Sequence, residues 1–244
     1  PFQALRYRRN VDLHEVCSPP YDVLSDLDRL ALATAHANNI VHIDMPLASS
    51  GNAYEHAAVV LIQWITEGVL VRDDQPSFTL YRMKFTDTTG KARNVVGVIG
   101  ALEVVDEGAG GVLPHERTTP KAKTDRLELT RATDANLSPV WGLSLAEGLS
   151  ALLTAPAELL GEITDDLGVV HSVERVTDTN RITQISAAIT AHPVVIADGH
   201  HRYAISRTYR DETRERTNSK STGAELTMTY INELIDEQLS VAAI

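Results

Sequence analysis

Apolar and polar residues alternate along this chain with two different periods, and each period predicts a different kind of element. In residues 52–67, apolar side chains recur every three to four positions, which is the spacing of an amphipathic helix. Asn52 stands where a helix cap belongs, and Gly68 stands where a helix ends. Similar patterns predict further helices over 25–37, 124–135, 150–163, 178–192 and 202–216.

Strands are predicted where β-branched and aromatic residues gather in short runs bounded by turn residues. Residues 77–85 and 93–105 are two such runs, and the turn sequence between them predicts a hairpin. The other predicted strands are the opening residues, 139–145, 169–176, 193–197, 226–234 and 239–244. This order of elements predicts a mixed α/β (α+β) fold, built as a single domain over residues 1–244. Because the chain stops on a predicted strand, we expect it to be truncated at its C-terminus.

Composition narrows the class of protein. The chain has 244 residues, 43% of them hydrophobic and 23% charged, which is typical of a soluble globular protein. No apolar run approaches the ~20 residues that a membrane span needs. The net charge of −11 disfavours nucleic acid as a partner and suits a cytoplasmic protein that handles small molecules. The single cysteine excludes an internal disulfide, no metal-ligand spacing is found among the histidines, and the oligomeric state stays open.

Five residues from Asp198 to Arg202 join an apolar predicted strand to the next helix. The first amides of a helix favour an anion, and Gly199 lets the backbone approach a phosphate closely. Arg202 can hold two phosphate oxygens with its planar guanidinium. His200 and His201 point to opposite sides if the segment is extended, so at most one of them faces a ligand. The segment predicts a phosphate-binding turn; the alternative is that Asp198 only caps the helix.

Two other segments supply side chains that could complete a site. Residues 113–126 form a loop stiffened by prolines, in which Glu116 stands beside His115 and several cations: Arg117, Lys121, Lys123 and Arg126. Such a mixture suits phosphoryl transfer, where cations neutralise oxygens and a carboxylate accepts a proton. The alternative is a solvated loop. Residues 18–25 place Tyr21 and Asp22 on a rigid turn after two prolines, where they either contact a substrate or serve a purely structural turn.

Three motifs carry a resemblance to known proteins: SPPYDVLS at 18–25, LPHERTTPKAKTDRLELTRATDANLSPVWGL at 113–143, and IADGHHRYAIS at 196–206. In this order they resemble the uncharacterised domain-of-unknown-function family numbered ten-fifteen, over nearly the whole chain. The DGHHR element is also similar to the phosphate-binding box of the ParB/sulfiredoxin-like fold. That second resemblance implies this fold, with additional helices and a hairpin, and a nucleotide as ligand.

The resemblance to the phosphate-binding box is carried by single positions. Gly199 and Arg202 match its glycine and its final arginine, which contact nucleotide phosphates. His200 stands where sulfiredoxin has a nucleophilic cysteine, so reduction of a sulfinic acid is not implied. Chromosome-partition proteins often have glutamate at that place, and this chain shows neither their helix-turn-helix nor a basic charge. The box of the kinase that phosphorylates free serine is the most similar, and it also matches Asp198.

Residues and resemblance together predict a nucleotide-binding enzyme that transfers a phosphoryl group, either a kinase for a small hydroxylated metabolite or a nucleotide hydrolase. The turn at 198–202 would hold a phosphate of a nucleoside di- or triphosphate, with Mg²⁺ expected beside it. His200 or His201 would donate a hydrogen bond or a proton, and Glu116, chosen by its chemistry, would be the base. Other predicted ligand contacts are Arg117, Lys121, Lys123 and Arg126 for phosphate, and Tyr21 and Asp22 for substrate. The alternative function is a non-catalytic nucleotide or anion sensor.

Overall fold

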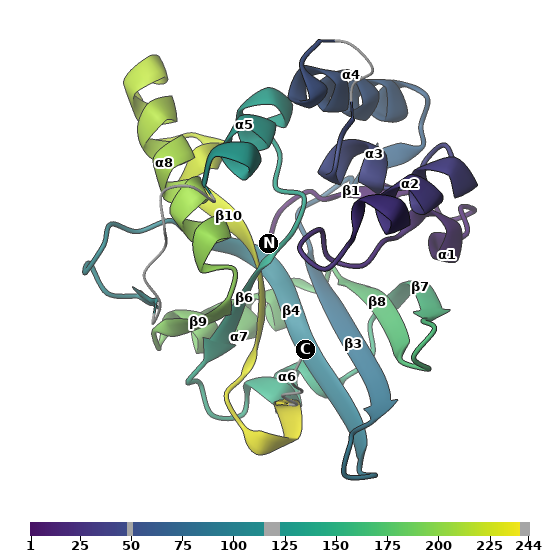
Figure 1. The fold of residues 1–244 in the computed structure, drawn as a ribbon. Coiled ribbons are helices and arrows are strands. Elements are labelled where there is room, and N and C mark those ends of the chain that lie inside the picture. The colour runs from purple at the N-terminus through teal and green to yellow at the C-terminus, as the bar shows by residue number, and fades with distance from the viewer. Residues whose placement is uncertain (48–50, 115–122, 240–244) are drawn as a thin grey trace.

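The computed structural model describes residues 1–47, 51–114 and 123–239 (Figure 1). Its α-helices are α1 (Leu13–Val16), α2 (Asp26–Ala35), α3 (Val41–Asp44), α4 (Ala53–Thr66), α5 (Lys123–Thr133), α6 (Leu149–Thr154), α7 (Thr179–Thr190) and α8 (His200–Thr217). Its strands are β1 (Leu5–Tyr7), β2 (Leu70–Arg72), β3 (Phe78–Thr86), β4 (Ala92–Glu103), β5 (Val112–Leu113), β6 (Val140–Ser144), β7 (Glu158–Thr164), β8 (Val170–Val176), β9 (Val194–Asp198) and β10 (Leu226–Glu233). Two 3-10 helices, η1 (Gly223–Glu225) and η2 (Asp236–Gln238), flank β10.

Most of the strands form one mixed sheet in the order β5-β9-β6-β10-β4-β3-β8-β7. β3 and β4 are antiparallel, with Leu80 opposite Val98, which confirms the predicted hairpin. β10 runs parallel to β6 and antiparallel to β4, so a strand from late in the sequence lies inside the sheet. Parallel and antiparallel pairs together with interspersed helices confirm the predicted mixed α/β fold. Its assignment to the ParB/sulfiredoxin-like class stays a prediction.

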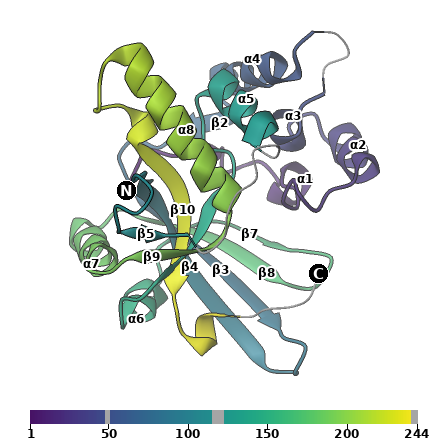
Figure 2. The ribbon, with the colours of Figure 1, turned by 60° about the vertical axis from the view of Figure 1, so that its left-hand side comes forward.

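The largest apolar core lies between the sheet and the helix pair α6 and α7. Leu80, Leu149 and Ile185 have no exposed surface there. Burying an aliphatic side chain of this size contributes about 1.5–3 kcal/mol to folding. Figures 1 and 2 show α6 and α7 at one side of the sheet, away from α5, α8 and the N-terminal helices. α5 and α8, which carry the predicted site residues Lys123, Arg126, His200, His201 and Arg202, therefore belong to a different part of the molecule.

A second apolar cluster joins the N-terminal helices to α5. Ile43 of α3, Leu61 and Trp64 of α4, and Leu70 of β2 pack together with Leu129 of α5. α5 packs against both α4 and α8, and Figure 1 shows it lying between them. This packing brings the N-terminal segment close to the helix that follows the DGHHR motif.

α8 is fixed to the sheet by Tyr203 near its start. The Tyr203 ring packs with Val140 and Ile196 of the underlying strands. Its hydroxyl accepts a hydrogen bond from the Val105 amide at 2.9 Å and donates to the Glu103 carbonyl at 3.2 Å. The first turn of the helix is thus held in one position relative to β4, β6 and β9.

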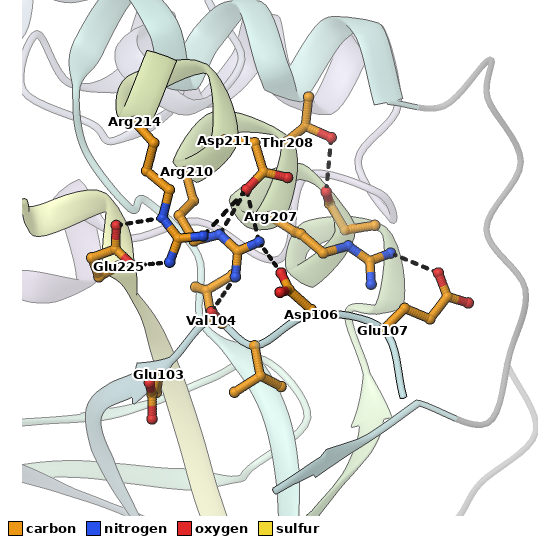
Figure 3. A network of polar contacts seen from close by, with 12 residues as sticks. Glu103, Val104, Asp106, Glu107, Arg207, Thr208, Arg210, Asp211, Arg214 and Glu225 are labelled. Atoms are coloured by element: carbon orange, nitrogen blue, oxygen red, sulfur yellow. Dashed lines mark hydrogen bonds and ion pairs between the residues drawn. The ribbon is translucent and has the colours of Figure 1, made fainter. Parts of the chain in front are cut away.

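A network of arginines fixes the second half of α8 (Figure 3). The Arg210 side chain is only 2% exposed. It donates to the Val104 carbonyl at 2.5 Å, to Asp106 Oδ1 at 2.5 Å and to Asp211 Oδ1 at 2.7 Å. Further ion pairs join Arg214 to Glu225 and Arg207 to Glu107. The network ties the helix to the end of β4, where the chain leaves the sheet.

The predicted helix over 150–163 is wrong beyond its first turns. α6 ends at Thr154, and Pro156 follows it, because proline and the residue before it do not continue a helix. Residues Glu158–Thr164 instead form β7, which pairs antiparallel with β8. The leucine-rich sequence has a helical pattern, but the free edge of β8 offers backbone partners. Here the tertiary context overrides local propensity.

The other predicted elements agree with the structure to within a few residues at their ends. α2 begins with a capping box, in which Ser25 and Asp28 form reciprocal hydrogen bonds. The strand predicted over 239–244 falls almost wholly on residues outside the described ranges. Within the described ranges, no helix combines the length and the apolar character needed to cross a bilayer.

Candidate functional site

The turn between β9 and α8 has a backbone conformation that favours glycine. Gly199 has φ 85° and ψ 28°, in the left-handed region that glycine adopts without strain. It occupies the N-cap position of α8, and no side-chain capping hydrogen bond is found there within the described part of the chain. Asp198 therefore does not cap the helix, contrary to the structural alternative; its carboxylate accepts a hydrogen bond from Arg202 instead. The uncapped first turn leaves amides suited to an anion.

Arg202 folds back over this turn. A Cβ atom at Gly199 would lie 3.0 Å from Arg202 Nε and 3.1 Å from its Cζ, so only glycine leaves room for the guanidinium. One terminal nitrogen of Arg202 donates to the Pro139 carbonyl and the other to Asp198. The side chain is 20% exposed. The guanidinium thus lies beside the start of α8, neither in the apolar core nor extended into solvent.

A small pocket, here called the charged pocket, opens beside Arg202. Tyr21, Asp44, Arg126 and Arg202 supply its ionisable side chains. Its remaining walls are Leu129, Thr130, Ala135, Asn136, Leu137, Ser138, Ile205, Ser206 and Thr227. The cavity offers about 50 Å³ to the centres of water-sized groups, whereas a single water needs about 10–15 Å³. A group the size of a phosphate or a carboxylate fits this space, and a whole nucleotide does not.

Arg126 is held by three partners at the mouth of the charged pocket. Its Nη1 donates to Asp44 Oδ1 at 2.9 Å, and its Nε donates to Asp125 Oδ2 at 3.0 Å. Its Cζ lies 4.1 Å from the centre of the Tyr21 ring, a cation–π contact. These contacts aim the guanidinium of α5 toward the same space as that of Arg202, so two cations from different helices face one pocket.

Asp44 is the negative partner inside this pocket. The residue is 8% exposed, and burial raises the pKa of its carboxyl, although the nearby guanidiniums of Arg126 and Arg202 oppose this. Burial likewise raises the pKa of the Tyr21 hydroxyl, against the effect of the same two arginines. Each arginine is thus paired with an aspartate, Arg126 with Asp44 and Arg202 with Asp198. An anion entering the pocket has to replace or join these carboxylates.

The structure brings together one side chain from each of the three sequence motifs: Tyr21, Arg126 and Arg202. Asp22 is exposed and does not line the charged pocket. Lys123 is the first residue of α5, and only its backbone is described. Three further predicted residues, Glu116, Arg117 and Lys121, lie outside the described residues.

The two histidines are arranged differently from the prediction of an extended segment. His200 and His201 are the first two residues of α8, so about 100° of helix rotation separates their side chains. His200 is buried, at 6% exposure. His201 is half-buried, and its Nε2 has no hydrogen-bond partner among the described residues. Neither histidine lines the charged pocket, and their proposed role as donors stays a prediction.

Sequence reasoning missed Asp44, because it stands in an apolar stretch with no motif around it. The only local signal is an acidic residue directly after the buried Val41 and Ile43. A carboxylate in such a position needs a cationic partner, and that partner, Arg126, lies 82 residues away. No single sequence could have named it.

The described residues hold no group of three or more His, Cys, Asp or Glu side chains that could bind a metal ion. Mg²⁺ that accompanies a polyphosphate needs only one or two protein carboxylates. Asp44 and Asp198 are carboxylates of the right chemistry beside the predicted phosphate position, so the residues present fit the expected ion.

Comparison with known proteins gives a family and nothing finer. A family model described as a protein of unknown function, DUF1015, matches residues 1–244. No match to the chain was found among curated proteins or among solved structures.

Proposed function

The chain belongs to the DUF1015 family, and we propose that it binds the phosphate groups of a nucleotide in the charged pocket and transfers or hydrolyses a phosphoryl group. One observation carries the proposal. The guanidiniums of Arg126 and Arg202 face the same phosphate-sized space, beside the start of α8, where glycine is the N-cap residue. Charged hydrogen bonds from two arginines together with helix amides are a common means of holding phosphate.

Binding would proceed by exchange of partners. Asp44 and Asp198 hold the two arginines in place before the ligand arrives, which avoids the cost of ordering free side chains. A phosphate carries more charge than a carboxylate and offers more acceptor oxygens, so it competes for the same guanidinium donors. Mg²⁺ bound to the polyphosphate would take up carboxylates that the arginines release.

The chemical step would need a base and a proton donor. Glu116 remains the proposed base, with His200 or His201 as a donor, and the acceptor would be a small hydroxylated metabolite such as serine, or water. The similarity of the DGHHR turn to the box of ParB/sulfiredoxin-like proteins supports this assignment. Tyr21 would act by placing Arg126.

A sensor without catalysis is the second candidate, and the ion pair between Arg126 and Asp44 favours it. That pair ties α5 to α3. If a phosphate drew Arg126 away from Asp44, the N-terminal helices would lose a contact with α5. Ligand binding would then change how the N-terminal segment packs, which is what a sensor requires.

Calorimetric titration of the purified chain with ATP, ADP and CTP, each with and without Mg²⁺, tests binding. Arg202→Ala should weaken the affinity by about 1.5–3 kcal/mol, because a charged hydrogen bond to phosphate is lost. Arg72→Ala removes the same charge from an exposed arginine outside the pocket and serves as the matched control. Equal affinities of the folded Arg202→Ala variant and the wild type would rule out the phosphate clamp.

Turnover separates the two candidates. Phosphate release and phosphoserine formation are followed with each nucleotide, with and without free serine. Product formation supports the enzyme, and Glu116→Gln should then lower turnover while leaving affinity nearly intact. Tight binding without any product supports the sensor.

A further inference from the structure

A second cavity, here called the adjoining pocket, continues from the charged pocket along α8. The two share Thr130, Ala135, Asn136 and Ser206 in their walls. From Ser206 onward, the adjoining pocket follows one face of α8 and is closed by the segment around η1. A ligand group held by Arg202 therefore has a direct path into this second space.

The two cavities differ in size. The charged pocket offers about 50 Å³ to the centres of water-sized groups, and the adjoining pocket offers about 370 Å³ on the same measure. Binding sites for small organic molecules occupy about 300–1,000 Å³. The first cavity accommodates one small anion, whereas the second accommodates the body of a metabolite.

The two cavities also differ in chemistry. Hydroxyl and amide side chains dominate the adjoining pocket, and its charged side chains are one acid and one base, Asp134 and Arg216. Tyr209 presents a half-buried ring, and its hydroxyl donates to Asp134 Oδ1 at 2.5 Å. That bond fixes the ring in the wall. A neutral, hydrogen-bonding cavity with a fixed aromatic ring suits a polar planar molecule better than a second phosphate.

One atom in the adjoining pocket lacks a partner. Thr222 Oγ1 is buried and makes no hydrogen bond within the described part of the chain. Buried hydroxyls nearly always have a partner, so an unpaired one calls for an explanation. Thr222 lines the adjoining pocket next to η1. The Oγ1 atom itself has almost no accessible surface, so a ligand hydroxyl or ring nitrogen would form the missing bond after a rotation of the Thr222 side chain toward the pocket.

We propose that the adjoining pocket holds the nucleoside part of the nucleotide whose terminal phosphate occupies the charged pocket. The inference rests on the proposed function and assigns the other half of the ligand. From Ser206 to Thr213 the helix rises ~10 Å, at 1.5 Å per residue, which is on the scale of a nucleoside. The Tyr209 ring packs on the base, while Asn136, Thr213 and Thr222 offer hydrogen bonds to base and ribose.

The test compares a whole nucleotide with a polyphosphate that has no nucleoside. Tripolyphosphate supplies a terminal phosphate for the charged pocket and no nucleoside for the adjoining pocket, whereas the tightest of ATP, GTP, CTP and UTP supplies both. Gly223→Leu is the variant that blocks the adjoining pocket. A Cβ atom at this position would have no heavy atom within 4 Å, and the φ of Gly223 suits any residue, so the larger side chain can be introduced without strain. Ser221→Leu adds the same side chain to an exposed residue of the same loop that does not line the pocket.

We expect the wild type to bind the nucleotide at least about tenfold more tightly than tripolyphosphate. Gly223→Leu should bring nucleotide affinity down to the level of tripolyphosphate and leave tripolyphosphate affinity unchanged. Ser221→Leu should change neither. Tyr209→Ala provides a second, independent variant in case the first does not fold, and it should lower nucleotide affinity selectively.

The two proposals fail in different ways. If tripolyphosphate binds, and Arg202→Ala weakens it, but neither folded pocket variant changes nucleotide affinity, then the nucleoside lies elsewhere and the phosphate site stands. If the wild type binds neither tripolyphosphate nor any nucleotide, or if Arg202→Ala has no effect on either, the phosphate site itself is wrong, and the assignment of the adjoining pocket falls with it.

Discussion

The two halves of α8 each hold an arginine bound to aspartate, and the two arginines differ in what surrounds them. Arg210 is 2% exposed and is bonded to a buried carbonyl and to two aspartates, as Figure 3 shows. Arg202 is 20% exposed, lines a cavity and lies against a glycine. The same side chain on the same helix thus serves to fix the fold at one place and faces an open space at the other.

This difference teaches how to separate structural arginines from candidate binding arginines. A buried arginine whose donors all end on protein acceptors, as Arg210 is, contributes to stability. An arginine that lines a pocket and is itself partly exposed, as Arg202 is, can exchange its aspartate for a ligand. Substitutions at the two ends should therefore affect different measurements.

The largest effect is expected for Arg210→Ala. The substitution leaves the buried Val104 carbonyl without its donor and opens a void under the helix, so the free energy of unfolding should fall by about 3 kcal/mol. Urea denaturation measures this loss. Arg207→Ala on the same helix is the control, because its pairing with the exposed Glu107 at 3.4 Å is worth about 0–1 kcal/mol. If the two variants lost similar unfolding free energies, Arg210 would not be the arginine that fixes the fold.

Gly199→Ala should lower stability less than Arg210→Ala does, but it should also weaken phosphate binding. A left-handed alanine costs about 1–2 kcal/mol, and its Cβ would also displace the Arg202 guanidinium at 3.0 Å. Gly148→Ala is the matched control: Gly148 is the N-cap of α6 with φ 81°, and its Cβ would meet no atom within 4 Å. Both variants should lose stability in thermal unfolding, Gly199→Ala the more, because its Cβ would also lie 3.3 Å from Val140 Cα. Only Gly199→Ala should lose phosphate affinity, and an equal affinity in both would show that Arg202 need not lie over the turn.

The smallest effect is the pH dependence of stability. Its sign differs between the arginine network of α8 and the charged pocket. The hydrogen bond from Arg214 lowers the pKa of Glu225 below its ordinary 4.5, so stability from this pair is present at neutral pH and is lost as pH falls through the lowered pKa. Burial raises the pKa of Asp44 above 3.8. The cost of burying the Asp44 charge is therefore relieved as pH falls through the raised pKa.

Urea denaturation between pH 7 and pH 3 checks this contrast. The unfolding free energy of Glu225→Gln should fall less on acidification than that of the wild type, and that of Asp44→Asn should fall more. Glu55→Gln, at an exposed position, should follow the wild type. Parallel curves for all three variants would contradict the opposite signs.

Much of the fold could be predicted because its signals are local. The cap at Asn52, the hairpin between β3 and β4, and the glycine turn before α8 are each read within a few residues. The strand β7 could not be predicted, because its conformation depends on pairing with β8 rather than on its own leucine-rich pattern. The family was predictable for a different reason, since long motifs identify it directly.

The candidate site was predictable only in part. Tyr21, Arg126 and Arg202 were named for their chemistry, and the structure places them around one pocket. Asp44 and the adjoining pocket were missed, because packing across distant segments creates them. The predicted Glu116 lies outside the described residues, so the base remains a sequence-based prediction.

The ion pair between Arg126 and Asp44 spans 82 residues, and the bond from Arg202 to the Pro139 carbonyl spans 63. Closing loops of that length lowers the entropy of the chain, and other contacts must offset this cost before these bonds can form. The charged pocket therefore comes into being only after its distant segments have docked. Any anion seated in it acts as a reversible crosslink between the beginning, the middle and the end of the polypeptide.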